Sequence, residues 1–371
     1  MLSGRYRQWM YDWETRLTSR DTNRVVRPLQ WGEEWAGRWP LVNGDFAPGA
    51  GSAERVSANV LADLNRRIVA HSDQFFSYRA PADFRLETGQ AARSKDDRRL
   101  EPAAWLRFTS PVETPYPENN IVTARWFPAA PGRSGGRPAV VVLPQWNSDA
   151  WGHNGLCRIL SRFGISCLRL SMPYHDVRMP AELERADYAV SANISRTIDA
   201  GRQAVIDIRC CLDWLQQQGS TDLGILGTSL GSCYAFLASA HDERLRVNAF
   251  NHASNFFGDV VWTGQSTRHV RAGMEPEITR EQLREAWLGI SPKSYFDKFA
   301  RWPKKSLVVY ARYDLSFLPE LSRDVVEEFR RWSLDFRSAV LPCGHYTTGE
   351  APFKYLDAWH LTRFLYGALR Q

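Results

Sequence analysis

The fold of this chain is decided by the stretch Leu223-Gly224-Ile225-Leu226-Gly227-Thr228-Ser229-Leu230-Gly231, which runs from a short apolar segment into helix-like sequence ending near Ala240. The pattern Gly-x-Ser-x-Gly therefore falls at a predicted strand-to-helix junction. A turn this tight brings backbone segments so close that only small side chains fit beside the serine, and Gly227 and Gly231 meet this requirement. Ser229 is then expected at the C-terminal edge of a sheet, at the positive end of the next helix.

The same pentapeptide pattern occurs a second time, at Gly132-Arg133-Ser134-Gly135-Gly136. This copy lies in a turn-rich segment, with no strand leading directly into it and no helix after it. Because the chemistry of the motif depends on its structural context, the two copies are not equivalent. We predict that Ser134 lies in a surface loop and that Ser229 is a nucleophile.

Composition places the chain among folded globular proteins and excludes several classes. Its 371 residues are 44% hydrophobic and 24% charged, and the net charge is +6. The basic residues form no long or aromatic-interleaved run, so we expect no nucleic-acid partner. No apolar run is long enough to cross a membrane and no export signal is found at the N-terminus, so we expect no integral membrane segment and a cytoplasmic location.

The six cysteines lack metal-ligand spacing and lie in or beside predicted core elements, so buried thiols are expected. They are Cys157, Cys167, Cys210, Cys211, Cys233 and Cys343.

The first hundred residues differ from the rest because tryptophans recur there at helical spacing. A Gly/Pro-rich break at 44–51 and helix-like sequence at 53–76 follow. We predict an N-terminal helical extension over 1–100 and a second domain over 101–371. The extension either buries its tryptophans against the main domain or forms a cap that shapes a site entrance. These tryptophans are Trp9, Trp13, Trp31, Trp35 and Trp39.

From residue 103 onward, short apolar runs alternate with amphipathic helices, which is typical of a mostly parallel sheet covered by helices on both faces. The eight predicted strands are 105–109, 121–127, 139–143, 166–170, 223–226, 246–250, 306–311 and 336–341. The predicted helices are 155–163, 195–217, 319–332 and 353–369. Aromatic residues between 251 and 305 predict a helical lid insertion, because a segment that long is rarely without structure.

A serine hydroxyl becomes reactive only beside a base, and that base needs an acid to orient it. Asp314 follows the strand 306–311 after a short turn, and His345 follows the strand 336–341. The carboxyl ends of parallel strands meet at one edge of a sheet. Ser229, Asp314 and His345 are therefore predicted to form a catalytic triad.

Three segments together resemble the nucleophile, acid and histidine loops of the α/β-hydrolase superfamily. They are Gly227-Thr228-Ser229-Leu230-Gly231, Ala311-Arg312-Tyr313-Asp314 with Pro319 downstream, and Cys343-Gly344-His345. The resemblance covers roughly residues 100–370 and implies the α/β-hydrolase fold. The loop Pro173-Tyr174-His175-Asp176-Val177-Arg178-Met179-Pro180 is similar to those of dienelactone-hydrolase-like and acyl-esterase-like branches.

The resemblance also implies how the reaction intermediate would be stabilised. Backbone amides of Leu230 and Trp146 would form an oxyanion hole. The family's His-Gly-x loop is replaced here by Pro144-Gln145-Trp146. The side chains of Gln145 or Asn147 are alternative donors, and Asp259 is an alternative acid because some members carry the acid after an earlier strand.

The function predicted from these features is hydrolysis of carboxylic esters through an acyl-enzyme, with a small-molecule ester substrate and no cofactor. An amidase, peptidase or acyltransferase with the same triad is an alternative, as are a non-catalytic binding protein of this fold and an interfacial lipase. His153, His175 and His252 are expected to line the pocket, but they lack metal-ligand spacing, so no metal site is expected. The sequence leaves acyl-chain length and oligomeric state open.

Overall fold

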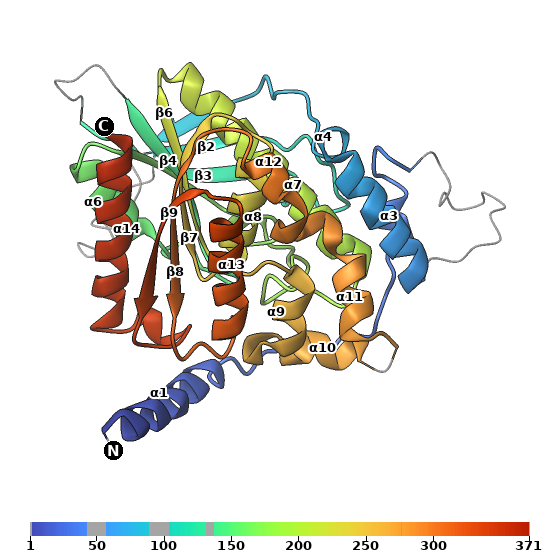
Figure 1. Cartoon of the computed structure of the whole chain (residues 1–371). Helices are drawn as coiled ribbons and strands as arrows, with labels where there is room; N and C mark the ends of the chain where they lie inside the picture. Colours follow the sequence, from blue (N-terminus) through green and yellow to red (C-terminus); the bar gives the residue numbers. More distant parts are fainter. Residues whose placement is uncertain (1, 43–56, 89–103, 131–136, 276, 371) are drawn as a thin grey trace.

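The computed structural model describes residues 2–42, 57–88, 104–130, 137–275 and 277–370. Within them, a nine-stranded sheet is covered by helices on both faces (Figure 1). Ser134, which we predicted in a surface loop, lies outside the described residues. None of the described helices combines the length and the apolar character needed to cross a bilayer.

The sheet has the strand order β1-β2-β3-β5-β4-β6-β7-β8-β9. The strands are β1 (Arg85–Thr88), β2 (Ala104–Thr109), β3 (Ile121–Phe127), β4 (Pro138–Leu143), β5 (Ser166–Leu170), β6 (Asp222–Thr228), β7 (Leu245–Asn251), β8 (Lys305–Ala311) and β9 (Asp335–Leu341). From β5 to β9 all neighbours are parallel. The first three strands pair antiparallel, and β3 also pairs antiparallel with β5.

Helices account for most of the rest of the described chain. They are α1 (Leu2–Thr18), α2 (Glu33–Ala36), α3 (Ala58–Ala70), α4 (Ser72–Phe75), α6 (Asn154–Arg162), α7 (Ile194–Gln217), α8 (Leu230–Ala240), α9 (Phe257–Thr263), α10 (Arg268–Met274), α11 (Arg280–Ala286), α12 (Phe296–Phe299), α13 (Pro319–Arg331) and α14 (Phe353–Leu369). Short 3-10 helices are η1 (Asp176–Arg178), η2 (Gln265–Thr267), η3 (Leu288–Ile290), η4 (Pro292–Tyr295) and η5 (Thr347–Gly349).

The core is divided by the sheet into two layers. Successive side chains of a strand point to opposite faces of the sheet. Strand β4 is buried along its whole length, so both of its faces are covered. Val141 packs in the layer that contains α7, α8 and α13, whereas Val140 and Val142 pack in the layer that contains α6 and α14. Figure 1 shows α6 and α14 on one side of the sheet and α7, α8 and α13 on the other. This burial on both faces explains the uninterrupted apolar sequence of the strand.

The strands from β2 to β9 lie within two residues of the eight predicted ones. The ninth strand, β1, lies in the region predicted to be helical. Its residues are exposed and carry alternating charge, with Glu87 paired to Arg107 of β2 at 3.1 Å. An exposed edge strand of this kind lacks the apolar alternation by which strands are predicted. The predicted helix 53–76 is two helices, α3 and α4, separated at His71; its first residues, 53–56, lie outside the described part of the chain.

The described part of the N-terminal region packs against several elements. Trp35 and Trp39 are buried, and Trp39 Nε1 donates to Asp199 Oδ1 on α7 at 3.1 Å. Helix α3 packs on α11 of the segment predicted as a lid. Helix α1 lies where β8 and β9 end (Figure 1). The domain boundary at residue 100 stays a prediction.

The turn between β6 and α8 is as tight as the motif predicts. Ser229 has φ 57° and ψ −120°, and its N–H donates to the carbonyl of Asn251 at 2.7 Å. A Cβ at Gly227 would lie 2.1 Å from the carbonyl oxygen of Gly231. A Cβ at Gly231 would lie 2.6 Å from the carbonyl oxygens of Leu143 and Pro144. Backbone atoms cannot move aside as flexible side chains do, so both positions require glycine.

We predict that Gly231→Ala lowers the free energy of unfolding by about 1–3 kcal/mol, because a methyl group there overlaps backbone atoms. Gly367→Ala on α14 is the matched control, since nothing lies within 4 Å of its added Cβ. Alanine in that helix should stabilise by about 1 kcal/mol. Urea unfolding measures both changes, and equal shifts of the two variants would contradict the steric argument.

Candidate active site

The structure brings together the three residues predicted as a triad. Ser229 Oγ lies 3.1 Å from His345 Nε2, and His345 Nδ1 lies 2.9 Å from Asp314 Oδ2. Ser229 comes from the turn after β6, Asp314 from the turn after β8 and His345 from the loop after β9. Three segments distant in sequence thus form one chain of hydrogen bonds at the C-terminal edge of the sheet.

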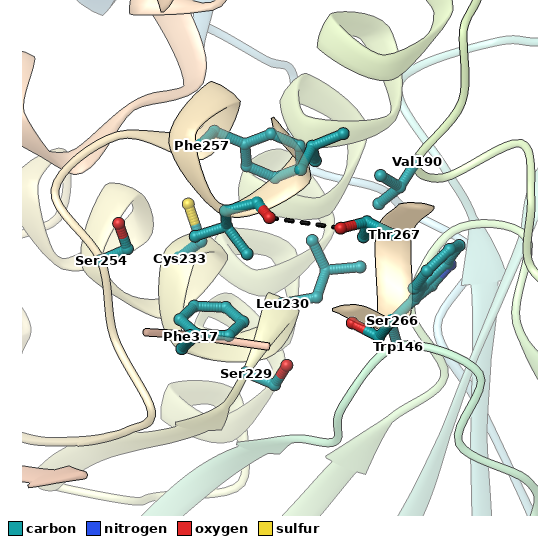
Figure 2. Close-up of a pocket in the computed structure, with 12 residues that line it drawn as sticks. Trp146, Val190, Ser229, Leu230, Cys233, Ser254, Phe257, Ser266, Thr267 and Phe317 are labelled. Atoms are coloured by element: carbon teal, nitrogen blue, oxygen red, sulfur yellow. Dashed lines mark hydrogen bonds between the residues drawn. The ribbon is translucent and has the colours of Figure 1, made fainter. Parts of the chain in front are cut away.

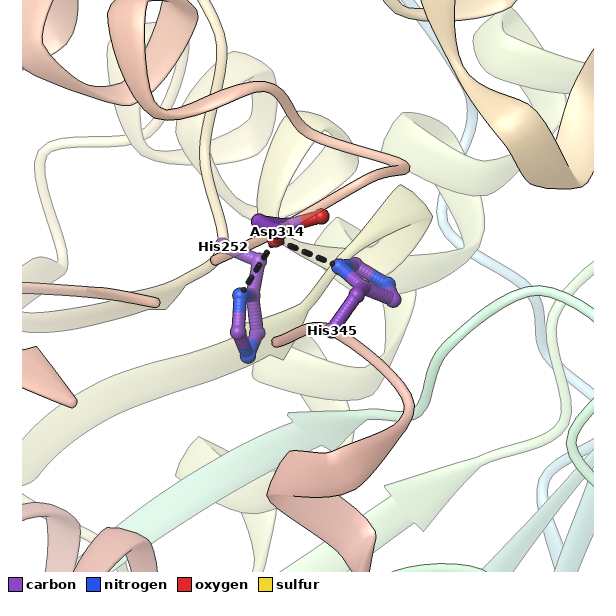
Figure 3. A group of neighbouring side chains, drawn as sticks. All are labelled: His252, Asp314 and His345. Carbon is purple, nitrogen blue, oxygen red and sulfur yellow. Dashed lines mark hydrogen bonds and ion pairs between the residues drawn. The ribbon is translucent and has the colours of Figure 1, made fainter. Parts of the chain in front are cut away.

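Asp314 is buried and all its hydrogen bonds come from groups that favour the ionised carboxylate. Its Oδ1 accepts the backbone N–H groups of Ser316 and Phe317, each at 2.7 Å. Its Oδ2 faces the Nδ1 atoms of two histidines, His345 at 2.9 Å and His252 at 3.1 Å (Figure 3). Burial alone would raise the pKa of Asp314, but the charge of His345 and the hydrogen bonds from both rings hold that pKa well below its ordinary value.

The ionised carboxylate fixes the tautomer of His345. Because Asp314 can only accept, Nδ1 of His345 carries the proton and Nε2 presents its lone pair to Ser229. Burial alone would lower the pKa of His345, but the charge and hydrogen bond of Asp314, with the charge of Glu14, raise it above the ordinary value. Phe317 stacks on the ring, with 5.3 Å between centroids and 8° between planes. The imidazole is therefore oriented to take a proton from Ser229.

His252 is a second histidine that contacts the same carboxylate, and from the sequence it was predicted only to line the pocket. It follows β7 with φ 57°, and its side chain is 1% exposed. Burial and the nearby charge of His345 lower the pKa of His252, which favours the neutral ring. The signal that could have found it is its position directly after a parallel strand, since that places it at the same edge as Asp314.

His252, Asp314 and His345 are also the cluster whose geometry comes closest to a metal-ligand set among the described residues. Both Nδ1 atoms already face the same carboxylate oxygen, and His345 Nε2 faces Ser229. A metal ion would have to replace these hydrogen bonds. The donor set therefore fits proton transfer better than metal binding.

The residues predicted for the oxyanion hole both lie beside Ser229. Leu230 begins α8, and Trp146 lines the same pocket as Ser229 and Leu230. Asn147, the next residue of this loop, adopts the left-handed conformation with φ 60°, which asparagine tolerates. Asn147 Oδ1 accepts the N–H of Ala186 at 2.8 Å, so this oxygen is engaged in holding the loop. The roles of the two amides stay predictions.

The alternative acid, Asp259, is engaged elsewhere. Its carboxylate accepts hydrogen bonds from Arg284, with Nη2 to Oδ2 at 2.6 Å, and pairs with Arg280 at 3.1 Å. These partners belong to α11, so the pairs join α9 to α11. Asp314, rather than Asp259, contacts His345.

Two hollows meet at Ser229. A small pocket of about 50 Å³ has mostly apolar walls, among them Leu230, Phe257 and Phe317 (Figure 2). A large cleft of about 660 Å³ contains Ser229 and His345 and extends to α14. Trp146 lines both hollows and stands at their junction. A substrate bound at Ser229 would thus be divided between a small apolar space and a larger, more polar one.

Glu14 on α1 is the functional candidate that sequence reasoning missed entirely. Its carboxylate is fully buried and accepts the N–H of Tyr346 at 2.7 Å, the N–H of Thr347 at 3.0 Å and the Thr347 hydroxyl at 3.1 Å. These residues directly follow His345. A carboxylate from the N-terminal helix therefore holds the loop that carries the histidine, and nothing in a single acidic residue on a helix predicts this.

Comparisons with solved structures show the fold. The model is similar to acetyl xylan esterase 1 from a Thermoanaerobacterium species, with 15% identity, a TM-score of 0.58, and coverage of 84% of this chain and 94% of that one. An acetyl xylan esterase from a Paenibacillus species matches with 12% identity, a TM-score of 0.57, and coverage of 85% and 96%. Acylaminoacyl peptidase from Pyrococcus horikoshii matches with 12% identity and a TM-score of 0.57 over 76% of this chain.

The chain spans 45% of the length of that acylaminoacyl peptidase. No protein-family model matches the sequence, and no curated protein matches it. The α/β-hydrolase fold predicted from the three motifs is confirmed by the sheet and by these structures.

We predict that Glu14→Gln lowers kcat by about ten- to a hundredfold, because an amide cannot accept from both backbone N–H groups and the His345 loop would shift. The variant should also lower the pKa that governs the loss of kcat/KM at acidic pH, since the charge of Glu14 raises the pKa of His345. Asp12→Asn, on the exposed side of the same helix, is the control and should change neither value. If the role of Glu14 were purely structural, Glu14→Gln would leave this pKa unchanged.

The pH dependence of kcat/KM should follow His345. Protonated His345 cannot take the proton of Ser229, so activity is lost as the pH falls through the pKa of this histidine. Because that pKa is raised, the midpoint should lie above about 6.5, the ordinary value. Initial rates with a non-ionising ester between pH 4 and 9 give the midpoint. A midpoint at or below the ordinary value would show that the pairing with Asp314 does not govern the base.

Proposed function

We propose that this protein is a serine hydrolase that cleaves carboxylic esters through Ser229, His345 and Asp314. The observation that carries the proposal is the continuous hydrogen-bond chain from Ser229 Oγ to the buried carboxylate of Asp314. The strained conformation of Ser229 adds support, because such strain persists mainly at functional sites. The similar structures include esterases and a peptidase, which fits this class of chemistry.

The proposed reaction has two steps. Ser229 Oγ bonds to the ester carbonyl carbon while its proton passes to His345 Nε2. The bond to the alcohol oxygen then breaks, and His345 returns the proton to that oxygen. Water attacks the acyl-enzyme with His345 again as base and releases the acid. Asp314 stays ionised throughout and stabilises the imidazolium.

The amides of Leu230 and Trp146 are proposed to stabilise the oxyanion of each tetrahedral intermediate. Both residues border the small pocket beside Ser229. Neither amide donates to an acceptor within the described part of the chain. Loss of one such donor costs about 100- to 1000-fold in kcat elsewhere.

The alternatives with the same triad differ in the bond attacked or in the acceptor. An amidase, peptidase or acyltransferase would share every residue named above, and one of the similar structures is that of a peptidase. A panel of esters and anilides with the same acyl group distinguishes them by the ratio of kcat/KM values.

We predict that a fluorophosphonate probe labels the protein. Ser229→Ala should abolish this labelling and lower kcat about a millionfold. The probe reacts only with an activated serine, so it also separates an enzyme from a binding protein of this fold. Ser134→Ala is the matched control, because Ser134 lies in the second copy of the sequence pattern. Persistent labelling of Ser229→Ala, or its loss in Ser134→Ala, would sink the assignment.

A further inference from the structure

Two neighbouring helices on the outside of the sheet, α6 and α14, carry a large share of the exposed apolar side chains (Figure 1). Of the fourteen large hydrophobic residues that are exposed in the described chain, five lie on these helices or at the residue that ends α6. They are Ile159, Phe163, Tyr355, Trp359 and Tyr366. The rings of Phe163 and Tyr366 meet edge to face, with 5.8 Å between centroids. The two helices therefore form one continuous surface, called here the α6/α14 surface.

The exposed charged side chains of this surface are all basic. They are Arg162, Lys354, Arg363 and Arg370. None of these four forms an ion pair with another described residue. The one acidic residue within the two helices is Asp357, and its carboxyl group is shielded from water. The surface thus holds several positive charges with no exposed negative charge among them.

Helix α13, on the other side of the sheet, shows that this charge pattern is not general (Figure 1). Its exposed residues include bases and acids together, namely Arg323, Arg330, Glu320, Asp324 and Glu327. Opposite charges offset one another on α13, whereas the positive charges of the α6/α14 surface add up. Such a surface attracts an anionic partner.

The aromatic side chains narrow the choice of partner. On α14, the guanidinium groups of Arg363 and Arg370 lie over the rings of Trp359 and Tyr366, at 5.1 and 5.3 Å from their centroids. Proteins place tryptophan and tyrosine beside basic residues where they meet a membrane, because the rings suit the headgroup region and the cations attract anionic lipids. A hollow of about 270 Å³ beside Arg162 and Arg370 offers a lipid phosphate two guanidinium groups.

The α6/α14 surface continues into the large cleft of the active site. Ile159 and Tyr355 belong to both, and Leu156 of α6 and Leu361 of α14 add to the apolar wall of the cleft. The aliphatic part of this wall suits an alkyl chain better than the bases of a nucleic acid, which bind through stacking and hydrogen bonds. His345 lines the same cleft and returns the proton to the leaving oxygen, so the alcohol of an ester extends along this wall.

We propose that the α6/α14 surface binds a membrane that contains anionic lipids. An ester whose alcohol carries a long alkyl chain then enters the large cleft from the bilayer, with its chain along Leu156 and Leu361. An acidic protein would match the charge as well, but it would cover the mouth of the cleft, whereas a membrane supplies the substrate. The membrane binding stands apart from the proposed function, and the delivery of the ester rests on it.

Sedimentation with vesicles tests the binding. Vesicles of phosphatidylcholine alone are compared with vesicles of phosphatidylcholine and phosphatidylglycerol, at low and at high salt. We expect a partition coefficient about tenfold or more higher for the mixed vesicles at low salt, because exposed cations attract the anionic lipid. High salt should remove most of this difference, since it screens exposed charges.

The double variant Arg162→Gln/Arg363→Gln locates the surface. It should lower the partition coefficient on mixed vesicles about twentyfold, because each basic residue beside an anionic membrane contributes about fivefold. Neither arginine lines the large cleft, so the hydrolysis of ethyl butyrate in solution should stay unchanged. The matched control is Arg323→Gln/Arg330→Gln, which removes the same charge from α13 and should bind vesicles as the unmodified protein does.

A pair of tryptophan variants tests the apolar contribution. Trp359→Ala should weaken vesicle binding about fivefold at high salt as well as at low salt, because contact between a ring and the headgroup region is not screened. Trp332 ends α13 and is similarly exposed, so Trp332→Ala is the control and should leave the binding unchanged.

Hexadecyl butyrate and ethyl butyrate test the delivery of the ester, because they share one acyl group. Hexadecyl butyrate held in mixed vesicles should be hydrolysed with a kcat/KM about tenfold higher than in phosphatidylcholine vesicles. Arg162→Gln/Arg363→Gln should remove this gain. Ethyl butyrate dissolved in water should respond neither to the lipid composition nor to the variant.

Several results would overturn the proposal. Equal partitioning onto the two kinds of vesicle at low salt is one, and equal losses in the α6/α14 and α13 variants are another. Vesicle binding without a gain for hexadecyl butyrate would contradict the delivery. If the surface instead bound a single-stranded oligonucleotide or polyglutamate and no vesicles, it would belong to a nucleic acid or an acidic protein. Failure of the proposed function looks different, because vesicle binding would persist while both butyrates and the fluorophosphonate probe failed to react.

Discussion

The geometry of the site depends on one buried carboxylate with a full set of partners. Asp314 accepts two backbone N–H groups at Oδ1 and faces two imidazole nitrogens at Oδ2. An ionised carboxylate is costly to bury unless it is paired and hydrogen-bonded, and here each oxygen is satisfied twice. Because the carboxylate stays ionised, it dictates the tautomer and orientation of His345, and His345 in turn contacts Ser229. Without this ion, neither imidazole would have a fixed direction.

The sequence predicted the parts of this arrangement that depend on local rules. A tight strand-to-helix turn requires glycine at 227 and 231, so the glycine pattern around Ser229 predicts the backbone conformation of this turn without knowledge of any tertiary contact. Strand β4 is apolar throughout because both its faces are buried, and the amphipathic helices beside it follow from the same principle. Since parallel strands share one C-terminal edge, Asp314 and His345 could be placed next to Ser229 from chain order alone.

The contributions that escaped prediction come from long-range pairing of single polar residues. Glu14 lies on an early helix and acts on a loop more than three hundred residues later, and no periodicity or motif connects the two. His252 was visible only as a pocket residue, because its link to Asp314 depends on the positive φ that follows β7. Strand β1 lies at an edge, where charged exposed residues remove the apolar alternation that reveals a strand.

Two aspartates, Asp314 and Asp357, show how the number of hydrogen-bond partners decides the pKa of a carboxyl group that is shielded from water. Asp314 has every acceptor position filled by the protein, and its pKa is held far below the ordinary value. Asp357 receives one hydrogen bond, from Asn251, and its pKa is raised to about 7 by burial. Burial raises the pKa of both carboxyl groups, so burial alone cannot account for the difference. The fully partnered carboxylate holds His345 through Nδ1, whereas Asp357 keeps one carboxyl oxygen without a partner among the described residues.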